Sequence, residues 1–214
     1  MNSQEFIRSV IQRIATGPEF SKSISLEEAD LAMSAILNNE ISDVQSAIFL
    51  IAMRMKRETI DENIGILLAL LKLTDCNQSS VENLVDIGDP YSGYNRSIPI
   101  SSFLPVLLAE LDLPCIIHGL DSVSPKYGLT HRHINKALGL DVDLSVAEAT
   151  SRLEDEAIGW SYLDQSKYCK TLHDLVPLRN QVIKRTILNT VETLIGPIRG
   201  INTHSILGYV HKSY

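Results

Sequence analysis

The sequence has no long apolar run and no recognisable signal peptide. Its most apolar stretch, residues 64–71, is interrupted by Gly65 and followed by Lys72. That stretch falls far short of the ~20 apolar residues that a membrane-spanning helix needs. The N-terminus has neither a basic start nor an apolar core, which are the marks of a secretory signal. We therefore expect a protein that neither spans a membrane nor is exported.

Cysteines and aromatic residues are also scarce. Aromatic residues make up 6% of the 214 residues, and the three cysteines stand far apart, at Cys76, Cys115 and Cys169. An odd number of widely spaced cysteines predicts free thiols and a reducing compartment, the cytoplasm. The hydrophobic and charged fractions of the sequence are ordinary, at 44% and 21% of the residues. This composition is typical of a globular protein and excludes a disordered one.

Charge is divided unevenly along the chain. Residues 1–113 carry 8 Lys and Arg against 16 Asp and Glu, a net charge of −8, whereas residues 114–214 carry 11 against 10. Residues 165–214 alone have 7 basic and 2 acidic residues, a net charge of +5. We expect an anionic ligand to meet this second half. The alternative is two solvated faces of one domain.

The first 75 residues predict an all-helical domain. Apolar residues recur at helical spacing over residues 6–14, and capping boxes at Ser25, Ser42 and Thr59 predict three more helices. The last two of these helices are apolar nearly all round. Such helices are buried on more than one side, in a core or against a partner chain.

From residue 80 the pattern alternates between strands and helices. Short apolar segments at 85–87, 114–118, 158–163 and 205–210 predict strands, and helices are expected at about 101–111, 130–138, 145–154, 172–182 and 187–194. The fold class predicted is α/β, with a helical domain at 1–75 and an α/β domain with a mainly parallel sheet at 80–214. Ligands of such sheets bind outside the carboxyl ends of the strands. We therefore expect the ligand site at the loops 88–97 and 118–128.

Common catalytic motifs are absent, including phosphate-binding P-loops, dinucleotide-binding glycine loops and zinc-protease motifs. The imidazoles of His131 and His133 would point about 200° apart on a helix, so surface or capping roles are expected rather than a shared metal. What remains is a set of residues suited to an anion. Serine hydroxyls at a helix start and nearby cations can hold a phosphate, and the candidates are Ser101, Ser102, His118, Lys126, Arg179 and Arg185.

The order of motifs along the chain resembles anthranilate phosphoribosyltransferases of glycosyltransferase family 3. The matching stretches are residues 25–29, 32–37, 40–45 and 52–59 in the first half, and 85–87, 100–101, 118–119, 122–124, 137–139, 143–145, 158–159, 177–179, 185–189 and 196–197 in the second. The resemblance implies a helical domain that forms a homodimer, an α/β domain that binds a phosphorylated sugar or nucleotide, and a Mg²⁺ cofactor.

The resemblance also implies site residues. The glycine-rich loop that cradles phosphoribosyl pyrophosphate falls on residues 89–94, and the phosphate- or substrate-binding set becomes Asp89, Ser92, Gly93, Asn95, Ser101, Ser102, His118, Gly119, Lys126, Arg179 and Arg185. Ser101 matches the metal–phosphate contact, and Arg179 matches a contact to the aromatic acid. Only one glycine remains in the loop, and a lysine of the family's next phosphate motif is Ile117 here.

The chain stops before the region that carries the family's Asp-Glu pair for magnesium. We therefore expect it to lack the C-terminal part of the fold, whether as a shortened chain or as one half completed by another polypeptide, and to leave residues 205–210 as an open sheet edge. The function predicted is a divergent transferase that binds a phosphorylated sugar or nucleotide. A nucleic-acid-binding paralogue without catalysis is the alternative, and a structural partner that only dimerises is a third.

Overall fold

The protein, seen in a computed structural model that describes residues 2–17, 19–89 and 91–208, has two compact units. The helical unit comprises Met1–Leu73 and Thr171–Ile195, and the α/β unit comprises Thr74–Lys170 and Gly196–Tyr214. The second half of the chain thus returns once to the helical unit before it re-enters the α/β unit. The domain bounds 1–75 and 80–214 stay a prediction.

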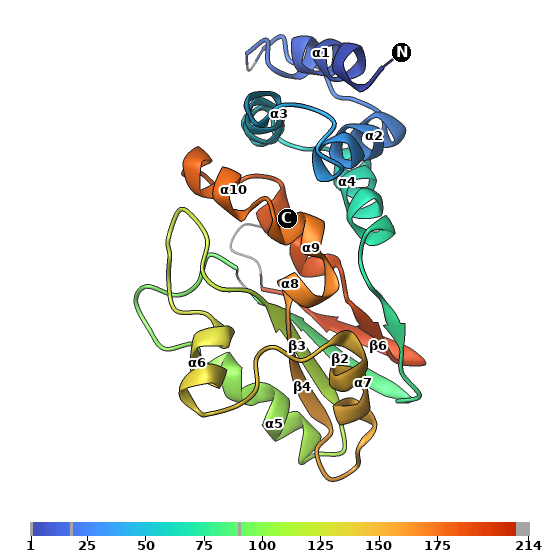
Figure 1. Cartoon of the computed structure of the whole chain (residues 1–214), viewed down its shortest axis with the longest axis vertical. Coiled ribbons are helices and arrows are strands. Elements are labelled where there is room, and N and C mark those ends of the chain that lie inside the picture. The colour runs from blue at the N-terminus through green and yellow to red at the C-terminus, as the bar shows by residue number, and fades with distance from the viewer. Residues whose placement is uncertain (1, 18, 90, 209–214) are drawn as a thin grey trace. The chain divides into compact units, whose positions relative to one another are not determined.

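The helical unit begins with four helices whose starts follow from their caps (Figure 1). Ser25, Ser42 and Thr59 each accept a hydrogen bond from the third helical amide and receive the reciprocal capping-box contact. The three predicted capping boxes are therefore confirmed. The helices are α1 (Ser3–Ile14), α2 (Leu26–Leu37), α3 (Asp43–Lys56) and α4 (Ile60–Lys72).

Close packing of α2 on α4 forms much of this unit's core. Gly65 makes the approach possible, since a Cβ there would lie 2.8 Å from the Cβ of Ala29. Phe49, Leu50 and Leu70 are fully buried. Other apolar side chains of α3 and α4 remain at the surface of the single chain, as expected if part of these helices faces a partner.

The helix expected at 172–182 is in fact two. Helix α9 (Lys170–His173) ends before α10 (Val176–Val182) begins, and Pro177 stands in the first turn of α10. Proline suits a first turn but has no backbone N–H to donate a hydrogen bond within a helix interior. The prediction of one continuous helix over residues 172–182 was therefore wrong. The helix predicted at 187–194 is present as α11 (Leu188–Val191) and the 3₁₀ turn η2 (Glu192–Leu194).

The α/β unit contains a four-stranded parallel sheet in the order β4-β3-β2-β6. The strands are β2 (Asn83–Gly88), β3 (Cys115–Gly119), β4 (Trp160–Asp164) and β6 (Asn202–Ile206). A separate parallel pair joins β1 (Asn77–Gln78) to β5 (Ile198–Arg199), which the sequence did not predict. The predicted class, a helical domain followed by a mainly parallel α/β region, is confirmed.

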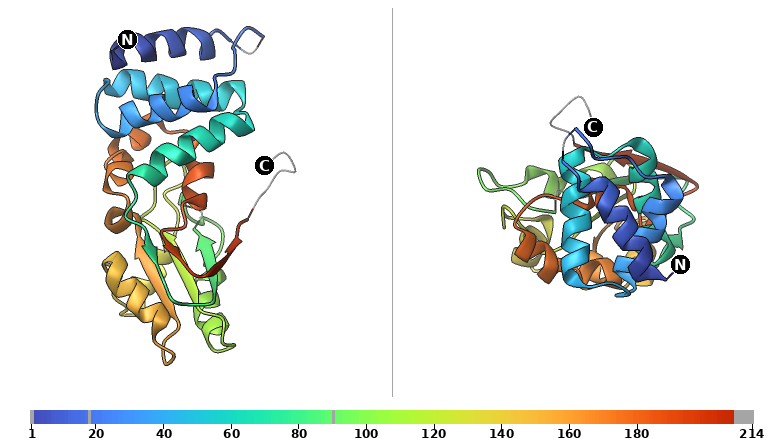
Figure 2. Two further views of the ribbon diagram at one scale, coloured as in Figure 1. Left: turned by 90° about the vertical axis from the view of Figure 1, so that its right-hand side faces the viewer. Right: turned by 90° about the horizontal axis from the view of Figure 1, so that it is seen from above.

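Helices cover both faces of this sheet. The 3₁₀ turn η1 (Ile100–Phe103) leads into α5 (Leu104–Ala109), and the remaining helices are α6 (His131–Ala137), α7 (Val146–Glu154) and α8 (Gln165–Tyr168). In the side view of Figure 2 the sheet lies between α5 and α7. Leu104 and Leu108 of α5 pack against a buried apolar cluster that includes Val85, Ile117 and Tyr162. Parallel sheets need this cover because both of their faces are apolar.

Strand β6 differs from its neighbours because its side chains are largely exposed. It forms one edge of the four-stranded sheet within the described part of the chain, with Asn202 opposite Asn83 and Ile206 opposite Ile87. The predicted range 205–210 started too late, and its last two positions lie outside the described residues. No helix in the described ranges is long and apolar enough to cross a membrane.

Candidate functional site

Three strands of the α/β unit end side by side, so that their carboxyl ends lie at one edge of the sheet. The register pairs Gly88 of β2 with His118 of β3, and Gly119 of β3 with Asp164 of β4. Asp89 follows β2 directly, and its amide donates to the carbonyl of His118 at 3.0 Å. The predicted residues Asp89, His118 and Gly119 therefore lie together at the edge where ligands of such sheets bind.

Two loops at this edge are held against each other by backbone contacts. Tyr94 and Leu129 form an isolated antiparallel bridge, and the Asn95 side-chain amide donates to the carbonyl of Lys126 at 3.1 Å. The amide of Gly128 donates to the carbonyl of Ser92 at 3.0 Å.

Glycine is required at the centre of this contact. Gly93 has φ +73°, and a Cβ on it would collide with the backbone of Gly128. The structure thus brings the predicted residues Ser92, Gly93, Asn95 and Lys126 into one loop pair, through backbone contacts and the side-chain amide of Asn95.

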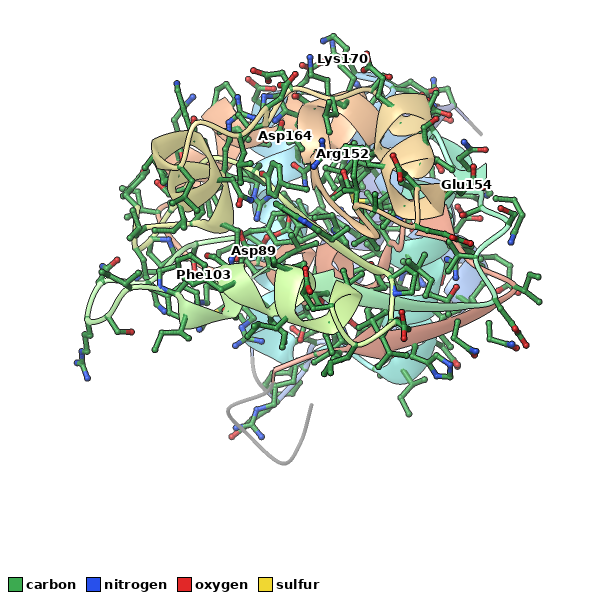
Figure 3. The ribbon with its side chains drawn as sticks, turned by 90° about the horizontal axis from the view of Figure 1, so that it is seen from below. Asp89, Phe103, Arg152, Glu154, Asp164 and Lys170 are labelled. Carbon is green, nitrogen blue, oxygen red and sulfur yellow. The ribbon has the colours of Figure 1, made fainter. Side chains whose placement is uncertain are left out.

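Asp89, His131 and Ser102 form a buried cluster that connects three elements. Nε2 of His131 lies 3.2 Å from Oδ1 of Asp89, and the His131 backbone amide donates to Oδ2 at 3.3 Å. The hydroxyl of Ser102 lies 2.6 Å from Nδ1 of His131, and that of Ser101 lies 3.5 Å from Nε2. Figure 3 labels Asp89 and Phe103, the last residue of η1, in the α/β unit. The cluster ties the end of β2 to η1 and to the start of α6.

The imidazole of His131 is neutral at pH 7. Burial lowers its pKa from 6.5 to about 4. Its Nδ1 and Nε2 contact the hydroxyls of Ser102 and Ser101, each of which can donate or accept a hydrogen bond. The expected surface or capping role is therefore wrong for His131, which is buried. It is right for His133, whose Nδ1 accepts from the amide of Thr130 at 3.1 Å.

A second buried network surrounds His118. Its Nδ1 lies 2.8 Å from the hydroxyl of Tyr91 and 3.2 Å from that of Tyr168, and the two hydroxyls are 2.7 Å apart. Its Nε2 lies 3.4 Å from Oδ1 of Asp86. Burial raises the pKa of Asp86, an effect that His118 and Arg199 partly offset. Tyr91, which the sequence placed inside the loop of the candidate site, thus anchors that loop to β3 and α8.

The third strand end is occupied by an acidic residue held by arginine. Asp164 accepts from Nη1 of Arg132 at 3.1 Å and from the hydroxyl of Tyr162 at 3.2 Å. Nη2 of Arg132 donates to Asp143 at 3.0 Å. Burial and the nearby Asp164 carboxylate raise the pKa of Tyr162 well above its ordinary value, so its hydroxyl keeps its proton.

Two of the residues predicted to bind a ligand, Arg179 and Arg185, belong to the helical unit. Arg179 is buried, and its guanidinium donates to both carboxylate oxygens of Glu192 at 2.7 Å each. Arg185 is exposed. The basic stretch 165–214 is likewise divided, because residues 171–195 fall in the helical unit and the others in the α/β unit. The roles of both arginines toward a ligand stay predictions.

Sequence reasoning missed His131, Arg132 and Tyr168 as residues of this edge. The sequence could have indicated His131 and Arg132, because they begin the helix that follows the loop after β3. Side chains at that position lie at the carboxyl edge of the sheet. Tyr168 lies on α8, a single turn that no sequence pattern predicted.

The residues at this edge do not form a ready Mg²⁺ site. The described residues contain no group of three or more His, Cys, Asp or Glu side chains that could hold a metal. Asp89, the carboxylate next to His131, already receives a hydrogen bond from the backbone amide of that histidine and lies 3.2 Å from its Nε2. A magnesium ion prefers carboxylates and substrate phosphates in octahedral geometry, and the described residues do not offer it such a set of side chains.

Comparison with known proteins agrees with this architecture. Residues 8–74 match the helical bundle domain of the glycosyl transferase family. An uncharacterized protein of Aquifex aeolicus is 30% identical over 191 residues, which cover 89% of this chain and 56% of the relative. Anthranilate phosphoribosyltransferase of Actinobacillus succinogenes is 31% identical over 174 residues, 81% of this chain and 51% of the enzyme.

Solved structures share the fold. Anthranilate phosphoribosyltransferase from Thermus thermophilus has a TM-score of 0.73 at 18% identity, over 94% of this chain and 58% of its own. The enzyme from Saccharomyces cerevisiae in complex with PRPP and Mg has a TM-score of 0.74 at 14% identity, over 91% of this chain and 56% of its own. The chain spans about half the length of the curated relatives it matches.

These matches first define the class, a glycosyl transferase fold in which a helical bundle accompanies a parallel α/β region. Within that class the chain belongs to glycosyltransferase family 3 and is anthranilate phosphoribosyltransferase-like.

Proposed function

We propose that the α/β unit is a divergent glycosyl transferase unit that binds a phosphorylated sugar or nucleotide at the carboxyl ends of β2 and β3. One observation carries the proposal. The partly exposed Ser101 stands at this edge beside the buried Asp89–His131–Ser102 cluster. Support comes from the shared fold of the Saccharomyces cerevisiae enzyme, which was solved with PRPP and Mg.

The chemistry of the edge suits one phosphate group. The hydroxyl of Ser101 is a hydrogen-bond donor for phosphate oxygens, and the exposed Lys126 adds a positive charge from the loop pair. Ser102 contributes differently, because its hydroxyl is buried and hydrogen-bonded to Nδ1 of His131. It holds the imidazole in place and leaves Ser101 to contact the ligand.

Calorimetry tests this proposal directly. The whole chain is titrated with ribose 5-phosphate and, separately, with phosphoribosyl pyrophosphate, each with and without Mg²⁺. We expect heat from at least one ligand, and weaker binding in Ser101→Ala and Lys126→Ala. Matched controls are Ser151→Ala on α7 and Lys22→Ala in the helical unit, which should bind as the unchanged chain does. No heat from either ligand at millimolar concentration would contradict the proposal.

We further propose that the helical unit forms a homodimer. Val44 and Ile48 on α3 are 68% and 39% exposed although both are large apolar residues. Burying such side chains against a second copy would remove them from water. Sedimentation of the chain at micromolar concentration should show a dimer, and Val44→Asp should shift it to monomer. A clean monomer for the unchanged chain would refute this.

The nucleic-acid alternative is not favoured, because the basic stretch at 165–214 is split between the two units and the relatives with a named activity that are reported above are anthranilate phosphoribosyltransferases. The reducing compartment also stays a prediction, consistent with three free cysteines.

A further inference from the structure

Two cysteines directly follow residues that are joined by a backbone hydrogen bond. The amide of Asp75 donates to the carbonyl of Tyr168 at 2.7 Å, and Cys76 and Cys169 are the next residues along the chain. Backbone segments joined by such bonds lie about 5 Å apart, and a disulfide requires Cα atoms about 4.4–6.8 Å apart. The hydrogen bond therefore places the two cysteines close to the separation that a disulfide requires.

The two segments are fixed by further contacts on either side of this hydrogen bond. Strand β1 begins directly after Cys76, where the amide of Asn77 donates to the carbonyl of Pro197 at 3.0 Å. Tyr168 is buried, and its hydroxyl lies 2.7 Å from that of Tyr91. The two cysteines are thus held at their positions by the surrounding backbone and by a buried side chain.

The thiols differ in their access to solvent and in their readiness to ionise. Cys76 is exposed, whereas Cys169 is buried. Burial raises the pKa of the Cys76 thiol, while Arg199 lowers it and Cys169 raises it. Because the thiolate is the reactive form of a cysteine, we expect the exposed Cys76 to react first, and faster in alkaline solution. Cys115 on β3 is buried, and burial raises its pKa to about 12.

Both cysteines also stand near the ends of one continuous segment of the α/β unit. That segment runs from Thr74 to Lys170, and the chain comes from the helical unit at its start and returns to it at its end. A bond between Cys76 and Cys169 would close almost the whole segment into a ring. Closing a long loop in this way restricts the unfolded chain and stabilises the folded one.

We infer that Cys76 and Cys169 form a reversible disulfide that closes this segment under oxidising conditions. The inference is independent of the proposed ligand binding. The oxidant is a small-molecule disulfide of the glutathione class. In a reducing compartment such bonds are transient and serve redox sensing, so this pair would respond to oxidative stress.

The reaction consists of two thiol–disulfide exchanges. The thiolate of Cys76 attacks the small disulfide, which forms a mixed disulfide and releases one small thiolate. The thiolate of Cys169 then attacks the sulfur of Cys76 and releases the second small thiolate. Two protein thiols are oxidised to one disulfide, the small disulfide is reduced to two thiols, and the protons of the cysteines pass to the released thiolates.

Oxidation of the whole chain tests this pair. The reduced protein is incubated with glutathione disulfide in mildly alkaline buffer, and mass spectrometry of the unreduced digest locates any bond. We expect a bond between Cys76 and Cys169 and the loss of both thiols to titration. The melting temperature should rise by about 5 °C or more, and dithiothreitol should reverse the rise.

Two variants distinguish this bond from other thiol reactions. Cys76→Ser alters an exposed side chain and should abolish both the bond and the rise in melting temperature. Cys115→Ala is the matched control, because it removes a buried thiol outside the pair and should retain both. Circular dichroism establishes that each variant folds.

Several results would overturn the inference. A stable glutathione adduct on Cys76 without the internal bond would show that the thiol of Cys169 is out of reach. A bond that involves Cys115, a bond between two copies of the chain, or no reaction at Cys76 would contradict it equally. None of these results bears on the proposed ligand binding, which calorimetry tests separately.

Discussion

The hydroxyl of Ser102 lies 2.6 Å from Nδ1 of His131, a contact between η1 and the first residue of α6. The other nitrogen of the same imidazole meets Asp89 at the end of β2. One neutral ring therefore joins three segments that are separated by loops in the sequence. Buried hydrogen-bonded networks of this kind fix a single arrangement of their members, which here defines the edge of the candidate site.

The stability of the chain should fall when the pH drops below about 6.5. The folded state holds the pKa of His131 near 4, below the ordinary 6.5, so the unfolded state binds more protons between these values. The part of the free energy of unfolding that depends on a neutral His131 is fully present above pH 6.5 and is lost progressively between pH 6.5 and pH 4. The total loss is about 3 kcal/mol.

Urea unfolding at a series of pH values measures this effect. Asp86, whose pKa is raised, acts in the opposite direction, so the quantity to compare is the difference between the unchanged chain and His131→Gln. The difference should vary between pH 4 and 6.5. His133→Gln, which alters a partly exposed capping residue, should show no such dependence. Parallel curves for the unchanged chain and His131→Gln would contradict the prediction.

Replacing Glu62 should destabilise the helical unit strongly. Its carboxylate accepts from Nζ of Lys56 at 2.6 Å and from the amides of Ile24 and Thr59 at 2.8 Å each, and it is fully buried. Glu62→Ala leaves a buried ammonium and two amides without this partner, at a cost of about 3–5 kcal/mol.

Chemical denaturation followed by circular dichroism gives the free energy of unfolding for this variant. Glu148 occupies the same capping-box position on α7 but is exposed, so Glu148→Ala serves as the matched control with a much smaller loss. Equal losses for the two variants would show that burial of Glu62 is unimportant.

Arg179 and Glu192 should behave as one unit when mutated. The two side chains form a buried, doubly hydrogen-bonded pair within the helical unit. Arg179→Met leaves the carboxylate buried without its guanidinium and should cost about 3–5 kcal/mol, whereas the double change with Glu192→Met should recover much of that loss. Thermal melting of the single and double variants measures the coupling, and strictly additive losses would count against the pair.

Adding one methyl group at Gly119 should disturb the candidate site from the backbone side. In Gly119→Ala the new Cβ meets the Asp89 carboxylate at 2.7 Å, so the carboxylate must move, at a cost of about 1–3 kcal/mol. The melting temperature should fall and the binding of ribose 5-phosphate should change.

Gly208→Ala is the matched control for this variant, because nothing lies within 4 Å of a Cβ there. A Gly119→Ala variant with unaltered melting temperature and ligand affinity would show that Asp89 does not pack against Gly119 in solution.

Local patterns in the sequence determined most of the secondary structure. Capping boxes at Ser25, Ser42 and Thr59 placed three helix starts correctly, because a cap is a contact within four residues. Short apolar runs likewise located β2, β3 and β4. The sequence did not predict the break before Pro177, the single turn of α8 or the two-residue strands β1 and β5. The last three elements have too few residues to show a hydrophobic period.

What the sequence alone determined is the fold class, the parallel sheet and the loops at its carboxyl edge, because hydrophobic period and caps act over neighbouring residues. Only the tertiary structure decided which charges meet there. In the folded chain His131 is buried against Asp89 and Ser102, and Arg179 pairs with Glu192 in the helical unit. Such pairings join residues 13 to 42 positions apart, and they depend on which groups become shielded from water together, a property that no local spacing records.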